Sequence, residues 1–167
     1  KRKTWRKLHL GLDLVSGQIV CSDLTTDDIG APTALPGLLD QVYGPVDLFL
    51  ADGAYDGKST SDLLAARFGS MTDVNILPPK NAVFSPDAAQ HPTSHDRHIA
   101  EIESKGRIAW HKSSGHNQRS RDETLIGHWK TVIRSKLQAR AFNNQKTEAK
   151  IGVRVLNRMT KLGRPNF

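Results

Sequence analysis

The sequence predicts one α/β domain in which a mixed sheet is flanked by helices. Period-two alternation near the N-terminus indicates antiparallel strands, whereas the apolar run at residues 46–51 lacks alternation and is typical of a strand buried on both faces. Helical periodicity fills most of the second half of the chain. At 167 residues the chain is long enough for one domain with its own core.

The first half is expected to place two strands, a helix and a third strand in order. Residues 5–12 and 19–24 alternate on either side of the turn residues Val-Ser-Gly-Gln, which predicts a β-hairpin. Residues 25–45 begin with capping residues, carry leucines at helical spacing and close on Gly-Pro, which predicts a helix; Pro36 either argues against this helix or marks its start. The apolar strand follows and ends at Asp52.

The second half is expected to be mainly helical. The predicted elements are a helix over residues 59–68, a short strand over 73–79, a loop over 80–98, a short helix and turn over 99–110, a helix over 119–141 and a last helix from 144 onward. This last helix should end before Gly163 and Pro165. Its predicted buried side consists of Ile151, Val155, Leu156 and Met159.

Charge is distributed unevenly along the chain. Residues 97–167 carry 16 Lys and Arg against 5 Asp and Glu, a net charge of +11, whereas residues 1–96 carry 8 against 12, a net charge of −4. The basic part suits a polyanion such as DNA, and the acidic part could hold cations.

Cysteine content and hydropathy indicate the cellular compartment in which the protein is expected. Cys21 is the one cysteine, so an intramolecular disulfide is excluded. No apolar stretch approaches the length of a membrane span, and the cationic start is followed by alternating residues and not by the apolar core of a signal peptide. We therefore expect a cytoplasmic protein without a membrane partner.

Asp52 stands where the apolar strand leaves the sheet. A half-buried carboxylate must be paired, hydrogen-bonded or metal-bound, so this position favours a chemical site. The alternative is an ordinary Asp-Gly turn. Asp56, four residues on, is expected to cap the next segment.

A second informative stretch runs from residue 116 to residue 130. On a helix, His116, Arg119 and Lys130 fall within about 40° of Glu123 and form one polar stripe. A carboxylate among cations suits a metal ligand flanked by phosphate-binding groups. The alternative is a simple pair between Arg119 and Glu123 on a solvated face.

Asp52 and Glu123 together suit a divalent-cation site for phosphoryl transfer. Mg²⁺, with Mn²⁺ as a substitute, prefers carboxylate oxygens, water and substrate phosphate. Two such ions can activate the attacking oxygen and stabilise the leaving oxygen. A site of this kind calls for a third carboxylate.

Six stretches, in order, resemble the DDE transposases of bacterial insertion sequences, specifically the family numbered five. They are TWRKLHLGLD, LTTDDIGAPTALPGLLDQV, ADGAYD, NILPPKNA, GRIAWHKSSGHNQRSRDET and VLNRMTKLGRP. The family signature is Tyr, two residues, Arg, three residues, Glu, six residues and Lys. It falls on His116, Arg119, Glu123 and Lys130, with His in place of Tyr. Lys80 stands where an arginine is common in the family.

The resemblance implies an RNase H-like fold and a set of residue roles. Asp52 and Glu123 would be the catalytic, Mg²⁺-binding carboxylates, and Arg119 and Lys130, assisted by His116, would hold DNA phosphates. The implied partners are transposon terminal repeats, target DNA and a second copy of the chain in a synaptic complex. The implied location is the bacterial nucleoid.

The resemblance also places the first strand and the first catalytic aspartate upstream of residue 4. Residues 1–167 are therefore expected to be the C-terminal part of one catalytic domain that lacks its first strand and is weak or inactive alone. Asp13 could be taken for the missing aspartate, but its position between a strand and a turn favours a turn residue.

Three histidines and an acid raise the question of a zinc site. His91, His95 and His98 lie close to Asp96 in sequence. Their spacing matches no zinc pattern, and Pro92 argues against a helix that would present them together. No zinc site is expected.

The expected function is Mg²⁺-dependent phosphodiester hydrolysis at transposon ends, followed by strand transfer into target DNA. The rival is a non-catalytic DNA-binding remnant of a decayed mobile element. The two hypotheses differ on whether Glu123 and a divalent metal matter. A self-sufficient nuclease that uses Asp13 is a third, less favoured hypothesis.

Overall fold

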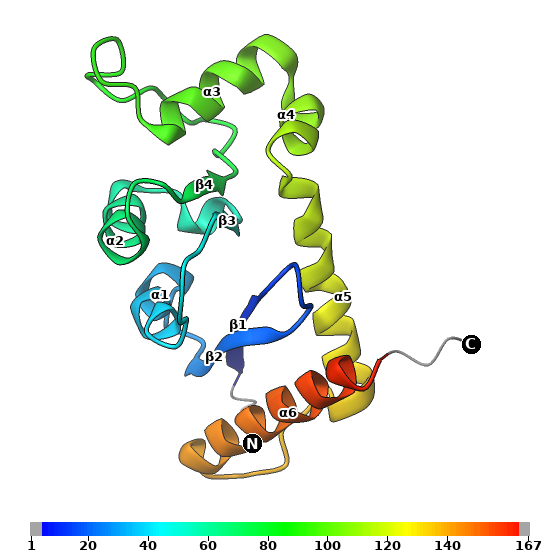
Figure 1. The fold of residues 1–167 in the computed structure, drawn as a ribbon. Coiled ribbons are helices and arrows are strands. Elements are labelled where there is room, and N and C mark those ends of the chain that lie inside the picture. Colours follow the sequence, from blue (N-terminus) through cyan, green and yellow to red (C-terminus); the bar gives the residue numbers. More distant parts are fainter. Residues whose placement is uncertain (1–4, 164–167) are drawn as a thin grey trace. The chain divides into compact units, whose positions relative to one another are not determined.

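The computed structural model describes residues 5–163 and divides the chain into two compact units. Unit 1 consists of residues 1–43 and 120–167, and unit 2 consists of residues 44–119. Each unit carries one two-stranded sheet (Figure 1). The predicted combination of antiparallel and parallel pairing is present, but the described strands form two small sheets in place of one mixed sheet.

The hairpin of unit 1 forms as predicted. Strands β1 (Arg6–Leu12) and β2 (Ile19–Thr26) pair antiparallel, with Leu8 opposite Leu24 and an irregularity after Gly11. The Asp13 carboxylate accepts the backbone N–H groups of Val15 and Ser16, as in an Asx-type turn. The prediction of a turn role for Asp13 is confirmed.

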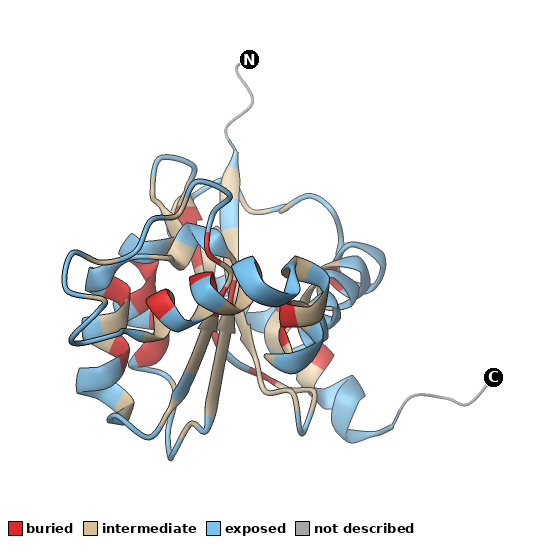
Figure 2. Cartoon of the chain, turned by 90° about the horizontal axis from the view of Figure 1, so that it is seen from above, coloured by how far each residue is buried: buried red, intermediate tan, exposed pale blue. Residues whose placement is uncertain are grey.

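Helix α1 (Ala31–Leu39) packs on this hairpin. Pro32 lies in its first turn, where a missing N–H costs nothing, and Pro36 is tolerated inside the helix. Its buried positions are Ala34, Leu35, Leu38 and Leu39. In Figure 2 buried positions are red patches on helices whose remaining surface is intermediate or exposed.

The remaining elements of unit 1 are helix α5 (Ser120–His128), the π-helical turn η3 (Trp129–Ile133) and helix α6 (Phe142–Lys161). The predicted helix over 119–141 therefore ends at Ile133. Residues 134–141 form an irregular segment, in which the Glu148 carboxylate accepts the backbone N–H groups of Gln138 and Ala139. Hydrogen bonds to a side chain of α6 thus take the place of the backbone hydrogen bonds that a longer helix would make here.

The core of unit 1 forms where α6 meets the hairpin and η3. Its buried members are Ile19, Leu24, Trp129, Ala149 and Leu156. Trp129 lies so close to Gly152 that a Cβ at that position would be 2.5 Å from the indole ring. A glycine in mid-helix, ordinarily destabilising, here makes room for the largest side chain of the core.

The predicted buried side of α6 is partly wrong. Leu156 is buried, together with Ala149 and Gly152, but Ile151, Val155 and Met159 are between 41% and 54% exposed. Packing selected the side of the helix that carries small residues, because only that side lets the Trp129 ring approach. Pro165 lies outside the described residues.

Unit 2 contains a parallel pair of strands joined by a helix. Strands β3 (Leu48–Ala51) and β4 (Asp73–Ile76) pair with Ala51 opposite Ile76, and helix α2 (Lys58–Phe68) connects them. Ala51 is the one buried residue of β3 and the other three are half-buried, so the prediction of burial on both faces holds only at the end of the strand. The short 3₁₀ turn η1 (Gly53–Tyr55) follows directly.

The predicted loop over 80–98 ends earlier than expected. Helix α3 (Ser94–Lys105) begins there, and its N-cap Thr93 and Asp96 form a reciprocal capping box. Pro92 precedes the N-cap and therefore does not interrupt the helix. Helix α4 (Arg107–Ser113) and the 3₁₀ turn η2 (His116–Arg119) complete unit 2.

Candidate active site

The candidate site in unit 2 is built at the end of strand β3. Asp52 follows the last strand residue, adopts an extended conformation and serves as the N-cap of η1, where its Oδ1 accepts the Ala54 N–H at 3.0 Å. The next residue must be glycine, because a Cβ at Gly53 would lie 2.9 Å from the Leu77 carbonyl oxygen. The Asp-Gly pair thus lies at the strand end, and its glycine lets the backbone pass close to the carbonyl oxygen of Leu77.

The signature segment contacts this strand end through two side chains. Arg119 Nη2 lies 3.1 Å from Asp52 Oδ2, and His116 Nε2 lies 2.9 Å from the carbonyl oxygen of Ala51. Both residues belong to η2. His116 and Arg119, the first half of the signature, therefore contact the end of β3. His116 contacts its backbone, and Arg119 contacts the carboxylate that follows it.

The ion pair between Arg119 and Asp52 is partly open to solvent. The side chains are 34% and 43% exposed, so the pair is worth at most about 1 kcal/mol. Among residues 5–163, Oδ1 of Asp52 accepts one hydrogen bond, from Ala54, and Oδ2 accepts one, from Arg119, whereas a carboxylate oxygen has two lone pairs. Asp52 can therefore still accept a hard cation, water or a further donor.

His116 is enclosed by other rings. It is 4% exposed, its ring centroid lies 5.1 Å from that of Trp110, and its Nδ1 lies 3.1 Å from Nδ1 of His111. Trp110 is fully buried and also contacts His98 edge-on at 5.3 Å. These four residues, His98, Trp110, His111 and His116, are called the ring cluster below.

The partners of His116 fix its tautomer. A carbonyl oxygen only accepts, so Nε2 carries the proton that is donated to Ala51. In neutral His116 the Nδ1 atom is then an acceptor, and His111 must donate from its own Nδ1. A chain of hydrogen bonds thus runs from His111 through His116 to the end of β3.

Burial favours this neutral form. It lowers the pKa of His116 below the ordinary value, and although the hydrogen bond to the Ala51 carbonyl opposes the shift, the nearby charges of His111 and Arg119 add to it. Burial likewise lowers the pKa of His98. The neutral forms of His98 and His116 are therefore favoured.

Glu123 and Lys130 lie in unit 1. Glu123 is exposed in the first turn of α5, where the partial positive charge of a helix N-terminus favours a carboxylate. Lys130 is exposed on η3, next to the buried Trp129. The structure brings Asp52, Arg119 and His116 together, and it describes Glu123 and Lys130 within the other unit.

Of the three histidines at positions 91, 95 and 98, two make contacts within unit 2. His95 Nδ1 lies 2.9 Å from Asp56 Oδ1, so Asp56 pairs with α3 and does not cap α2, whose N-cap is Gly57. His91 is exposed and His98 belongs to the ring cluster. Within residues 5–163 no three His, Cys, Asp or Glu side chains gather as metal ligands.

The sequence did not predict that Trp110 and His111 pack against the signature residue His116. Both lie in the stretch GRIAWHKSSG, which carries part of the family resemblance, and their position a few residues before the signature was the available signal. Their contribution depends on α4 turning back against η2, which local periodicity does not reveal.

Comparison with known proteins identifies the family. A sequence model described as the transposase DDE domain matches residues 1–158. The chain belongs to this transposase family. Its members carry out transposition by DNA cleavage and transfer, so membership implies an interaction with DNA. A search of the solved structures found no match. None of the helices between residues 5 and 163 could cross a membrane.

Proposed function

We propose that the chain is a DDE transposase of the insertion-sequence family numbered five. The observation that carries the proposal is the attachment of the signature segment to the β3 end through His116 and Arg119. Contacts with Ala51 and Asp52 are not expected of signature residues that lie only on a solvated helix face. Both units are assigned to one RNase H-like catalytic domain over residues 1–167, since the family match spans both.

Asp52 and Glu123 are proposed as metal ligands. Asp52 keeps free lone pairs and partial exposure, and Glu123 is an exposed carboxylate, which fits a hard divalent cation such as Mg²⁺ or Mn²⁺. When bound, such a cation would activate the attacking oxygen and stabilise the leaving oxygen of a phosphodiester. With two of the three implied carboxylates assigned, weak cleavage by the chain alone is expected.

Arg119 and Lys130 are proposed to bind DNA phosphates. Arg119 donates to Asp52 through Nη2, which leaves other N–H groups of its guanidinium for a phosphate. The resemblance gives His116 the same part, but its burial leaves it almost no exposed surface for a phosphate. We assign His116 instead to positioning, because it holds the residue that precedes Asp52.

Transposon terminal repeats and target DNA are the proposed substrates, two copies of the chain would join in a synaptic complex, and the protein would act in the cytoplasm at the nucleoid. The rival remains a non-catalytic, DNA-binding remnant, which would retain the basic surface without needing Asp52 or Glu123.

The deciding experiment measures nicking of supercoiled plasmid in Mg²⁺ or Mn²⁺. Glu123→Gln and Asp52→Asn should each abolish any cleavage, whereas Glu103→Gln and Asp47→Asn, which alter other exposed acids, should leave it unchanged. Binding of Mn²⁺, followed by its electron paramagnetic resonance signal, should weaken in the same two variants. Metal-independent DNA binding with no effect of Glu123→Gln would favour the remnant.

A further inference from the structure

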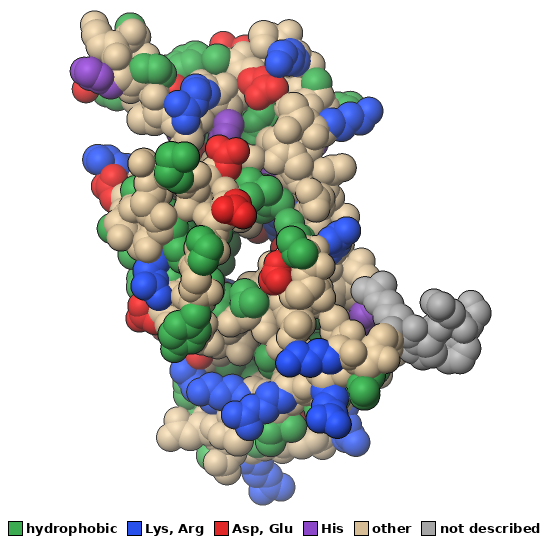
Figure 3. Space-filling model, viewed as in Figure 1, with side chains coloured by type: hydrophobic (Ala, Val, Ile, Leu, Met, Phe, Trp, Pro, Cys, Tyr) green, Lys and Arg blue, Asp and Glu red, His purple; other side chains and the backbone are tan. Residues whose placement is uncertain are grey.

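Helix α6 carries a row of cations that the signature does not include. Lys150, Arg154, Arg158 and Lys161 are all exposed and fall within an arc of about 80° on this helix. They are called the α6 ridge below. Figure 3 shows Lys and Arg side chains gathered over the part of unit 1 where Figure 1 places α6.

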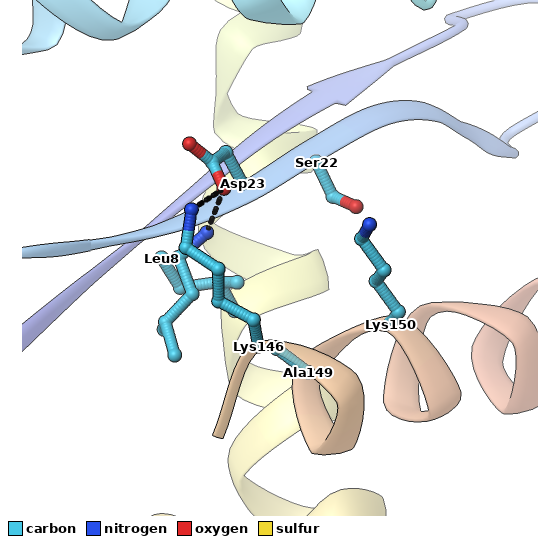
Figure 4. A pocket seen from close by; sticks show the side chains of 7 residues that line it. Leu8, Ser22, Asp23, Lys146, Ala149 and Lys150 are labelled. Atoms are coloured by element: carbon cyan, nitrogen blue, oxygen red, sulfur yellow. Dashed lines mark hydrogen bonds and ion pairs between the residues drawn. The ribbon is translucent and has the colours of Figure 1, made fainter. Parts of the chain in front are cut away.

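Within residues 5–163, the ion pairing of α6 involves Lys146 and not the ridge. Lys146, one turn earlier, reaches Asp23 on β2 at 3.1 Å, as Figure 4 shows, while Lys150 rises from the following turn. In the described part of the chain no ion pair involves any ridge residue. The sequence has no acid after Glu148, and the Glu148 carboxylate is engaged by backbone N–H groups.

Helix α6 sets the spacing of the ridge residues. Its opposite side is fixed to the core by Ala149, Gly152 and Leu156, and two hydrogen bonds join Asn157 to the backbone of Ile19, both at 2.8 Å. From Lys150 to Lys161 the rise is about 16 Å, and one strand of duplex DNA carries about five phosphates over that length. Four cations in line therefore match the charge density of a DNA strand.

The ridge is also linked to a signature residue. Trp129, which packs on Gly152, directly precedes Lys130, so Lys130 and α6 belong to one packed body. Building on the proposed function, we propose that the α6 ridge binds the phosphate backbone of duplex DNA, independently of sequence and in addition to Arg119 and Lys130.

An anionic membrane is the competing partner, because the half-exposed Ile151, Val155 and Met159 lie beside the ridge. Interfacial helices typically insert bulky aromatic or leucine side chains and leave their apolar face unburied by protein. In α6 the small-residue face packs on the core and the exposed strip has no aromatic residue. DNA therefore fits the ridge better.

The test measures binding of the full chain to 30-base-pair duplexes by fluorescence anisotropy in EDTA, between 50 and 200 mM salt. The variant is Lys150→Gln/Arg154→Gln/Arg158→Gln. The slope of log K against log salt should become shallower by about 2 to 3, because each lost phosphate contact removes about 0.9, and affinity at 0.1 M salt should fall at least tenfold.

Two control variants separate the ridge from general charge. Lys58→Gln/Lys105→Gln/Lys112→Gln removes the same charge from exposed positions of unit 2 and should leave the slope nearly unchanged. Arg154→Lys/Arg158→Lys keeps the charge and should also retain the slope. Thermal unfolding by circular dichroism should be the same for all variants, since only exposed side chains change.

Several outcomes would overturn the proposal. The proposal would fail if the salt slope of the ridge variant stayed unchanged, or if the unit 2 control lost as much slope as the ridge variant. It would also fail if the ridge variant lost affinity only for a duplex that carries a transposon terminal repeat. Loss of binding to phosphatidylserine vesicles without a change on DNA would assign the ridge to membranes. Because EDTA prevents cleavage, failure of the plasmid-nicking experiment leaves this result intact, and the two proposals fail separately.

Discussion

The two halves of the signature are held in different ways. His116 and Arg119 contact the end of β3 through side-chain hydrogen bonds, and His116 is buried among other rings. Glu123 and Lys130 are exposed on α5 and η3, and among residues 5–163 neither side chain takes part in an ion pair. A motif with one regular spacing thus contains a half fixed by tertiary contacts and a half fixed by local structure.

This difference teaches how far a spacing can be interpreted. Helical spacing predicts one polar stripe from His116 to Lys130, but His116 is buried on η2, and Glu123 and Lys130 lie on two different elements, α5 and η3. Substitution of His116 should therefore affect stability, while substitutions of Glu123 and Lys130 should affect ligand binding alone.

The largest effect is expected from removing the buried ring of the first half. His116→Ala should lower the free energy of unfolding by about 2–4 kcal/mol, because it leaves a cavity beside Trp110 and removes the donor to Ala51. Urea unfolding followed by fluorescence would measure this. His128→Ala, at an exposed position of α5, is the matched control and should cost less than about 0.5 kcal/mol. Equal losses of unfolding free energy in His116→Ala and His128→Ala would show that tertiary contacts do not hold the His116 ring.

A smaller effect is expected where η3 packs on α6. Gly152→Ala should destabilise the protein by about 1–3 kcal/mol, because the added Cβ would lie 2.5 Å from Trp129. Gly127→Ala in α5 meets open space and should stabilise it by about 0.5–1 kcal/mol. Thermal melting of the two variants should move in opposite directions, and a shared direction would show that the Trp129 contact is not as close as described.

The ring cluster should make stability depend on pH. The folded pKa values of His98 and His116 lie below the ordinary 6.5, so the unfolded chain takes up protons first as pH falls. Their stabilising contribution is fully present above pH 6.5 and is lost as pH falls through the folded pKa values. Unfolding should therefore need less urea at pH 5 than at pH 7.5.

His116→Gln isolates the part of this dependence that belongs to the signature. Glutamine can still donate to Ala51 but does not titrate, so the difference between pH 7.5 and pH 5 should shrink. His91→Gln, at an exposed histidine, should leave the wild-type difference in place. A pH dependence that His116→Gln leaves unaltered would assign the effect to other groups, His9 among them, whose pKa burial also lowers.

The smallest effect on stability is expected in the second half of the signature. Lys130→Gln should change the free energy of unfolding by less than about 0.5 kcal/mol, since the side chain is exposed. It should reduce the salt slope of DNA binding by about 0.9, as expected for one phosphate contact. Calorimetry and anisotropy on the same preparation would check both, and a large stability loss with an unchanged slope would reverse the assignment.

Much of the fold could be predicted from local pattern. The hairpin, α1, the β3-α2-β4 segment and the turn role of Asp13 follow from alternation, helical spacing and turn residues, because each depends on neighbours in sequence. Asp52 was correctly placed at the strand end. The capping box at Thr93 and Asp96 was a visible signal for α3 that the preceding proline obscured.

The sequence by itself determined the elements, the charge asymmetry and the carboxylates that could hold a metal. Only the tertiary structure decided that α5 gives way to η3, that α6 buries its small side, and that His116 turns inward to Ala51. These outcomes depend on which large ring finds room beside which small residue, as Trp129 does at Gly152. Close packing between segments distant in sequence sets them, and no local period encodes it.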